Sequence, residues 1–141
     1  MLKSSGAIIA LIGLACLLGG MVFFGAIMAP LVFTKLPPAT ADLFIRATFP
    51  RYYAYVAVTA GLAAIGFLLR GNFALAIILA LVLVLTIWLW RYWLPHLDQV
   101  RAAGNQAAFA WGHRLSVWLN GAQLLAVLAV LIAIARQWRR G

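Results

Sequence analysis

The sequence predicts an all-α protein, an integral membrane four-helix bundle with up-down-up-down topology. Of its 141 residues 67% are hydrophobic and only 9% are charged, against about 25% charged residues in soluble proteins. Four long apolar runs alternate with short polar segments, and a helix needs about 20 apolar residues to cross a bilayer. A soluble fold of this size could not bury so much apolar surface. We therefore expect one transmembrane domain, residues 1–141.

The first membrane helix is predicted at residues 7–33, which carry no charge. Pro30 removes a backbone hydrogen bond and is expected to kink its last turn. Four glycines on this helix are expected to let a neighbouring helix approach closely. They are Gly13, Gly19, Gly20 and Gly25.

A polar connection follows, in which Pro37 and Pro38 end the first helix. A short amphipathic segment after it is expected to lie on the membrane surface. Thr40 is its predicted N-cap, and Asp42 stands in its first turn, where a negative charge is favourable.

The second and third membrane helices are predicted at residues 50–69 and 73–93. Pro50 suits the first position of a helix. The tight turn Arg70-Gly71-Asn72 forces the two helices into an antiparallel hairpin, and Pro95 is expected to end the third helix.

A second amphipathic turn, around Leu97 and Arg101, is broken at Gly104-Asn105. The fourth helix is predicted at residues 106–135, a length of about 45 Å at 1.5 Å per residue. It exceeds the bilayer core, so its first two turns should reach the headgroup zone.

Four membrane helices place both termini on one side. That side carries five basic residues in free ends and a tight turn: Lys3, Arg70, Arg136, Arg139 and Arg140. The other side carries six, mostly within helical segments, together with both acids: Lys35, Arg46, Arg51, Arg91, Arg101 and Arg114. The bias of positive charge toward the cytoplasm predicts cytoplasmic termini, in a bacterial inner (plasma) membrane.

Polar side chains gather at the predicted non-cytoplasmic mouth. The candidate ligand-binding residues are Arg51, Tyr52, Arg101, His113, Arg114, Ser116 and Asn120. Three of them, His113, Ser116 and Asn120, share one face of the last helix. That face is expected to point inward, because polar side chains are costly toward lipid.

Three interpretations of this mouth remain open. The polar side chains can simply join neighbouring helices by hydrogen bonds. They can line a pocket for a small anion, a lipid headgroup or a quinone. Alternatively, His96 and His113 can ligate haem b or copper, although the two lie 17 residues apart with no H-x-x-x-H or C-x-x-C motif.

The function predicted is therefore non-enzymatic binding of a small solute, lipid headgroup or partner, with a haem- or copper-binding redox protein as the alternative. No catalytic residue is predicted, because Asp98 and His96 stand on a connector without a nucleophile. Despite a net charge of +9, nucleic acid is excluded as a partner because no basic, aromatic-bearing soluble face exists. The lipid bilayer is the expected partner, and small-residue seams permit a homo-oligomer or a membrane partner protein.

An ordered set of short motifs covers residues 7–135. The motifs are Phe24-Gly25, Ala29-Pro30-x2-Phe33, Phe49-Pro50-x-Tyr52-Tyr53, Pro95 with Arg101, and His113-x2-Ser116-x3-Asn120. This set resembles the transmembrane protein 205-like family, whose bacterial members carry a domain of unknown function numbered 4149. The resemblance implies a four-helix integral membrane protein with no established biochemical activity. The layout is also distantly similar to four-helix families linked to copper resistance and haem-dependent protoporphyrinogen oxidation, which carry histidines inside their helices; here the first three predicted helices have none.

Overall fold

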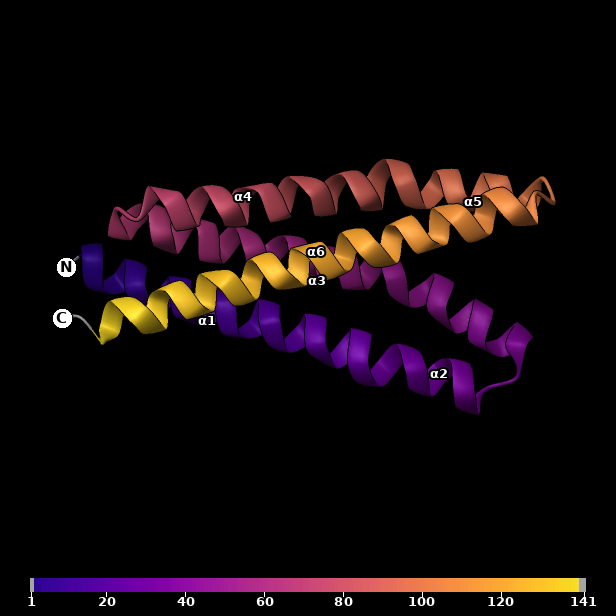
Figure 1. The fold of residues 1–141 in the computed structure, drawn as a ribbon, viewed down its shortest axis with the longest axis horizontal. Coiled ribbons are helices and arrows are strands. Elements are labelled where there is room, and N and C mark those ends of the chain that lie inside the picture. Colours follow the sequence, from indigo (N-terminus) through magenta and orange to yellow (C-terminus); the bar gives the residue numbers. More distant parts are fainter. Residues whose placement is uncertain (1, 140–141) are drawn as a thin grey trace.

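The computed structural model describes residues 2–139, which form four long helical rods joined by short turns (Figure 1). The first rod consists of α1 (Leu2–Val22), the π-helical η1 (Phe23–Met28) and α2 (Ala29–Lys35). The second is α3 (Pro38–Arg70). The third consists of α4 (Phe73–Trp88), the π-helical η2 (Leu89–Trp93) and α5 (Leu94–Ala102), and the fourth is α6 (Gln106–Trp138). All four rods are long and apolar enough to cross a membrane.

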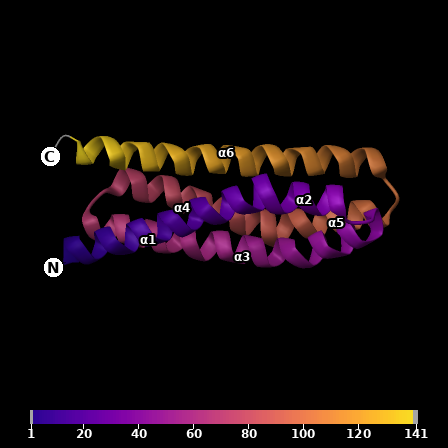
Figure 2. The same ribbon diagram turned by 90° about the horizontal axis from the view of Figure 1, so that it is seen from below.

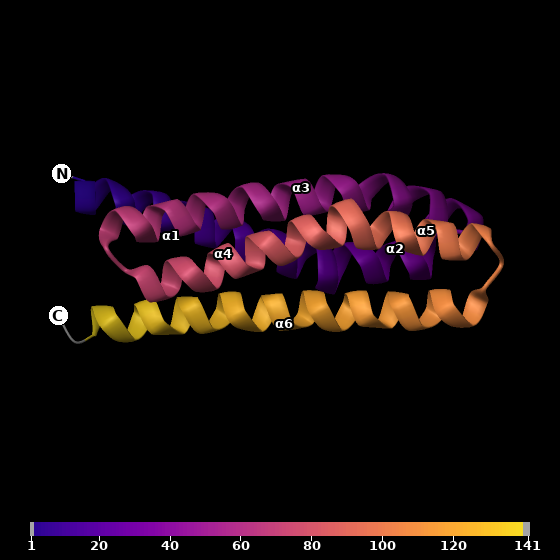
Figure 3. The same cartoon turned by 90° about the horizontal axis from the view of Figure 1, so that it is seen from above.

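The rods run up, down, up and down, as predicted. The start of α1 and the end of α6 lie at the same end of the bundle, which we call the termini end (Figure 1). The turns after α2 and α5 lie at the opposite end, the loop end. α3 packs against α1 and α4, and α6 lies along one side of these helices (Figures 2 and 3).

The core runs along the contact between α1, α3, α4 and the second half of α6. Its fully buried side chains include Leu14, Leu17, Phe67, Leu79 and Val127. Large apolar side chains on the outer faces are exposed, among them Ile8, Val84 and Leu125. An apolar core inside an apolar exterior is the pattern of a bundle whose solvent is lipid.

Glycines bring α1 and α3 into backbone contact. A Cβ atom on Gly13 would lie 2.6 Å from the backbone nitrogen of Ala63, and one on Gly66 would meet the backbone of Ala10. Gly20 lies beneath the ring of Tyr55, so the predicted close approach is confirmed at Gly13 and Gly20. It is wrong at Gly19 and Gly25, where a Cβ would meet nothing within 4 Å.

The predicted helices 7–33, 50–69, 73–93 and 106–135 each lie within one rod, and every rod extends beyond its predicted helix. The two amphipathic segments between them are present. The first forms the opening turns of α3 and the second is α5, so each is continuous with a membrane helix.

The capping, first-turn and proline assignments at the start of the second rod were wrong. α3 begins at Pro38, with Pro37 as its N-cap, so Thr40 lies inside the first turn and Asp42 lies beyond it. Pro50 lies inside α3 rather than at its start. Side-chain donors bond carbonyls around this proline, with the hydroxyl of Thr48 on Phe44 O (2.7 Å) and the guanidinium of Arg51 on Ala47 O (2.5 Å). Such side chains help a proline-containing membrane helix to continue.

Pro95 does not end the third rod, and Pro30 likewise stands inside the first. A π-helical turn precedes each proline, with the amide of Ala29 bonded to Phe24 O and that of Leu94 to Leu89 O, five residues earlier. The wider π-helical turn accommodates one extra residue just before the proline. Because the proline has no amide hydrogen to donate, this arrangement lets the helical rod continue beyond it.

The predicted breaks at the other two turns are confirmed. Gly71 takes φ = 83° and Gly104 takes φ = 75°, left-handed conformations that favour glycine. The side chains of Asn72 and Asn105 then cap α4 and α6 by accepting from Leu75 N and Ala108 N. These caps fix where the following helices begin.

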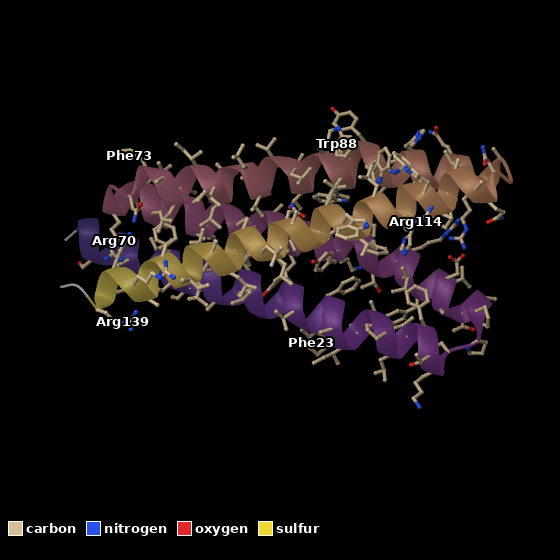
Figure 4. The ribbon with its side chains drawn as sticks, viewed as in Figure 1. Phe23, Arg70, Phe73, Trp88, Arg114 and Arg139 are labelled. Carbon is tan, nitrogen blue, oxygen red and sulfur yellow. The ribbon has the colours of Figure 1, made fainter. Side chains whose placement is uncertain are left out.

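Basic residues mark both ends of the bundle. Arg70 and Arg139 lie at the termini end, and Arg114 lies toward the loop end (Figure 4). The side chain of Lys3 and the whole of Arg140, also predicted at the termini end, lie outside the described part of the chain.

Candidate functional site

Both acids of the chain lie in one ion-pair cluster at the loop end, formed by Asp42, Arg46, Asp98 and Arg101. Arg101 Nη1 lies 2.5 Å from Asp42 Oδ1, Arg46 Nε lies 3.6 Å from Asp42 Oδ2, and Arg46 Nη2 lies 3.9 Å from Asp98 Oδ1. The cluster links the start of α3 to α5. Its side chains are 32–53% exposed, so each pair contributes little to stability, about 0–1 kcal/mol.

An aromatic cluster of Phe24, Phe49, Tyr52 and Tyr53 lies next to the ion-pair cluster, on the side toward the termini end. The rings of Phe24 and Tyr52 stack with centroids 4.2 Å apart, and those of Phe49 and Tyr53 stack at 5.9 Å. Phe24 belongs to η1, so the π-helical turn of the first rod packs directly against α3.

A row of polar side chains on α6 faces the other helices. Trp93 Nε1 donates to Ser116 Oγ (2.9 Å). One turn deeper, Asn120 Nδ2 donates to the Tyr53 hydroxyl (3.3 Å). We call Ser116, Asn120 and Gln123 the polar row. Gln123 Nε2 donates to Val82 O of α4, so the polar row connects α6 to η2, α3 and α4. This agrees with the expectation that Ser116 and Asn120 point inward.

Arg51 and Arg114 lie at about the same depth. α3 and α6 both run from the loop end to the termini end, and the hydrogen bond from Asn120 places it level with Tyr53. Six residues back from each, about 9 Å, lie Arg114 and Ala47. The guanidinium of Arg51 reaches back to Ala47 O, which brings it to the level of the Arg114 backbone.

Neither of these two arginines has a carboxylate partner among residues 2–139. Arg51 is exposed, and its guanidinium donates to the backbone carbonyl of Ala47. Arg114 is exposed on the loop-end half of α6 (Figure 4). Asp42 and Asp98 already face Arg46 and Arg101, so Arg51 and Arg114 remain uncompensated. Arg91, which lies over the Trp90 ring, and Lys35 also have no carboxylate partner in the described chain.

Residues 12–106 match the family described as "Domain of unknown function (DUF4149)". The chain belongs to this family. A search of curated proteins and a search of solved structures found no match. The matched span runs from α1 to the first residue of α6, so the whole polar row lies beyond it.

One predicted inward-facing residue of this DUF4149 member points elsewhere. His113 is exposed and stacks on the Phe109 ring, with centroids 6.2 Å apart. In helical projection it lies only about 20° from Asn120, so rotation does not explain the difference. At the depth of His113, α6 packs through Gly112 against Leu97 of α5, and this contact leaves the His113 side uncovered.

The other predicted residues divide between the clusters. Tyr52 is half-buried against Phe24. Arg101 belongs to the ion-pair cluster and also stacks over Phe109, 4.9 Å from the ring centroid. His96 is exposed and lies against the Trp93 ring, with centroids 5.5 Å apart. Within the described residues no group of three or more His, Cys, Asp or Glu side chains could hold a metal ion.

Three buried polar residues escaped the sequence reasoning: Thr59, Thr86 and Gln123. Gln123 is 3% exposed and Thr86 is 0% exposed, and the two are hydrogen-bonded to each other (2.8 Å). A signal was present, because Gln123 lies one turn after Asn120 on the same face of a long apolar helix.

Proposed function

We propose that this DUF4149 member is a non-enzymatic membrane protein that binds a phosphate-bearing anion at its loop end. The ligand is a phospholipid headgroup or a small soluble phosphate compound. The observation that carries the proposal is the uncompensated pair Arg51 and Arg114 at one depth, beside arginines whose charge the two acids already balance. The finer likeness to the transmembrane protein 205-like family forms part of this proposal and rests on the ordered sequence motifs.

The chemistry of these residues suits a phosphate. A guanidinium offers a planar fork of donors that matches phosphate oxygens. Basic residues at a membrane surface gain about 1 kcal/mol each from an anionic headgroup layer. Tyr52 follows Arg51 in the chain and stacks on Phe24, and these rings supply apolar surface for an acyl chain.

The double variant Arg51→Gln/Arg114→Gln is expected to bind anionic lipid about 30-fold more weakly than the parent, since two arginines at about 1 kcal/mol each are lost. Native mass spectrometry of the detergent-purified protein, titrated with phosphatidylglycerol, phosphatidylcholine or inorganic phosphate, measures this. Loss for phosphatidylglycerol alone identifies a headgroup site. Loss for inorganic phosphate as well identifies a site for small anions.

The matched control is Arg70→Gln/Arg139→Gln, which removes the same charge at the termini end. We expect it to bind phosphatidylglycerol like the parent. Equal losses of phosphatidylglycerol binding in the two double variants would show that binding depends on net charge alone. Unchanged binding in Arg51→Gln/Arg114→Gln would refute the site. A haem absorption band or stoichiometric copper in the purified protein would instead favour the redox alternative, with His96 and His113 as the ligands to replace.

The proposal includes an orientation in which the termini are cytoplasmic. Arg70 and Arg139 lie at the termini end without an acid of the described chain beside them, which suits the cytoplasmic side. Alkaline phosphatase fused after residue 141 should therefore be inactive in cells, and the same enzyme inserted at the Gly104-Asn105 turn should be active. The reverse pattern would place the arginine site in the cytoplasm.

A further inference from the structure

Gln123 holds an unpaired acceptor in the middle of the bundle. Its Nε2 donates to Thr86 Oγ1 (2.8 Å) and to Val82 O (3.1 Å), and the Thr86 hydroxyl donates to Val82 O (2.8 Å). Its Oε1 is buried and has no hydrogen-bond partner among the described residues. The side chain as a whole is 3% exposed.

This position offers no bulk water. Gln123 is the eighteenth of the 33 residues of α6, about 25 Å from the first residue of the helix and about 22 Å from the last. A buried carbonyl without a partner loses its hydration and gains nothing in return. Turning the amide over would be worse, because Nε2 would lose its two acceptors and its hydrogens would replace the unpaired oxygen.

The rest of the polar row has complementary groups to spare. Within residues 2–139, Asn120 Oδ1 accepts no hydrogen bond, and the Tyr53 hydroxyl accepts from Asn120 but donates to no acceptor. Ser116, Asn120 and Gln123 lie within about 60° of one another around α6 and span about 10 Å along it. Free acceptors and a free donor on one face call for a group that both donates and accepts, which is the chemistry of a hydroxyl.

We propose that a hydroxyl group, from water or from a lipid alcohol, binds in the middle of the bundle and donates a hydrogen bond to Gln123 Oε1. The site is distinct from the arginine site at the loop end and stands independently of it. The polar row leads from the loop-end side of α6 to this oxygen, and Thr86 holds the amide in place from the opposite helix.

The variant Gln123→Glu turns this oxygen into an infrared reporter. A carboxyl is nearly the same shape as the amide, and in this apolar setting it stays protonated. Its O–H replaces the amide donor toward Thr86, and its C=O occupies the place of Oε1. The chain has no glutamate of its own. A ¹³C label on the glutamate side-chain carboxyl, read as the difference from the unlabelled variant, therefore separates the carbonyl band of residue 123 from those of the aspartates and the lipid esters.

In vesicles of the native lipid extract we expect this band at the lower frequency of a hydrogen-bonded carbonyl. Phosphatidylcholine vesicles, whose lipid has no hydroxyl, separate the two sources. A band that stays low there identifies water. A band that rises there and falls again when diacylglycerol is added identifies a lipid alcohol. A free-carbonyl band in every membrane would overturn the proposal.

A measurement on the parent protein covers the case in which the variant does not fold. The chain has four glutamines, and Gln99, Gln106 and Gln137 are exposed, so side-chain ¹³C-labelled glutamine gives three surface signals and one buried one. In solid-state NMR, magnetisation should pass to the buried Cδ from water protons or, in diacylglycerol-containing membranes, from the lipid hydroxyl. A buried signal that receives none from either source would refute the site.

Discussion

Replacing Gly66 with alanine is expected to destabilise the bundle by about 2–3 kcal/mol. A Cβ there would meet the backbone of Ala10, which cannot rotate away as a side chain would. α1 and α3 must then separate along their whole contact, and overpacking of this kind costs about 1–3 kcal/mol or more. Unfolding by SDS in mixed micelles measures the loss.

The same substitution at Gly19 is the matched control. Gly19 also lies within a membrane helix, but a Cβ there meets nothing within 4 Å. Alanine favours a helix over glycine by about 1 kcal/mol, so Gly19→Ala should leave the bundle equally stable or slightly more stable. Opposite signs at the two positions would establish the α1–α3 backbone contact, whereas two neutral substitutions would show that the helices do not approach so closely.

The same comparison shows what sequence can predict of this fold. Four apolar runs, the Pro37-Pro38 pair, and the local chemistry of Gly71, Asn72, Gly104 and Asn105 predicted the rods and the three turns between them. The glycines of α1 are equivalent in sequence. Gly13 and Gly19 differ by about 240° around the helix, and only the position of α3 decides which of them is in contact.

Prolines were the other source of error. Sequence rules place a proline at the start or beyond the end of a helix, because it lacks an amide hydrogen. In this bundle Pro50 stands inside α3 with side-chain donors nearby, and Pro95 follows a π-helical turn. Both solutions depend on groups one turn away, which a rule based on the proline alone does not consider.

The candidate site was predictable where one physical cost governs it. Exposing a polar side chain to lipid has a large free-energy cost, and this cost places Ser116 and Asn120 inward. Arg101 could not be assigned to the ion-pair cluster, since its partner Asp42 lies 59 residues away. Whether His113 is buried or exposed depends on whether another helix packs against its side of α6 at that depth, which the sequence does not show.

Replacing Trp93 with leucine is expected to loosen the loop-end half of α6. Trp93 packs against Trp88 with centroids 5.5 Å apart, meets the edge of Trp111 at 6.4 Å, and donates to Ser116. Truncating a fully buried aromatic side chain costs about 3–5 kcal/mol. Trp93 is half-buried, so we expect about 2 kcal/mol, again measured by unfolding in mixed micelles.

Two further variants separate packing from hydrogen bonding. Trp93→Phe keeps an aromatic ring but cannot donate to Ser116, and hydrogen bonds between membrane helices average about 0.6 kcal/mol, so its loss should be the smaller. Trp118→Leu is the control, because this side chain is 77% exposed on the outer face of α6 and its removal should change stability little. Equal losses for Trp93→Leu and Trp118→Leu would mean that Trp93 does not anchor α6. A loss confined to Trp93 would show that the π-helical turn η2, by carrying this ring, holds the polar row of α6 against the bundle.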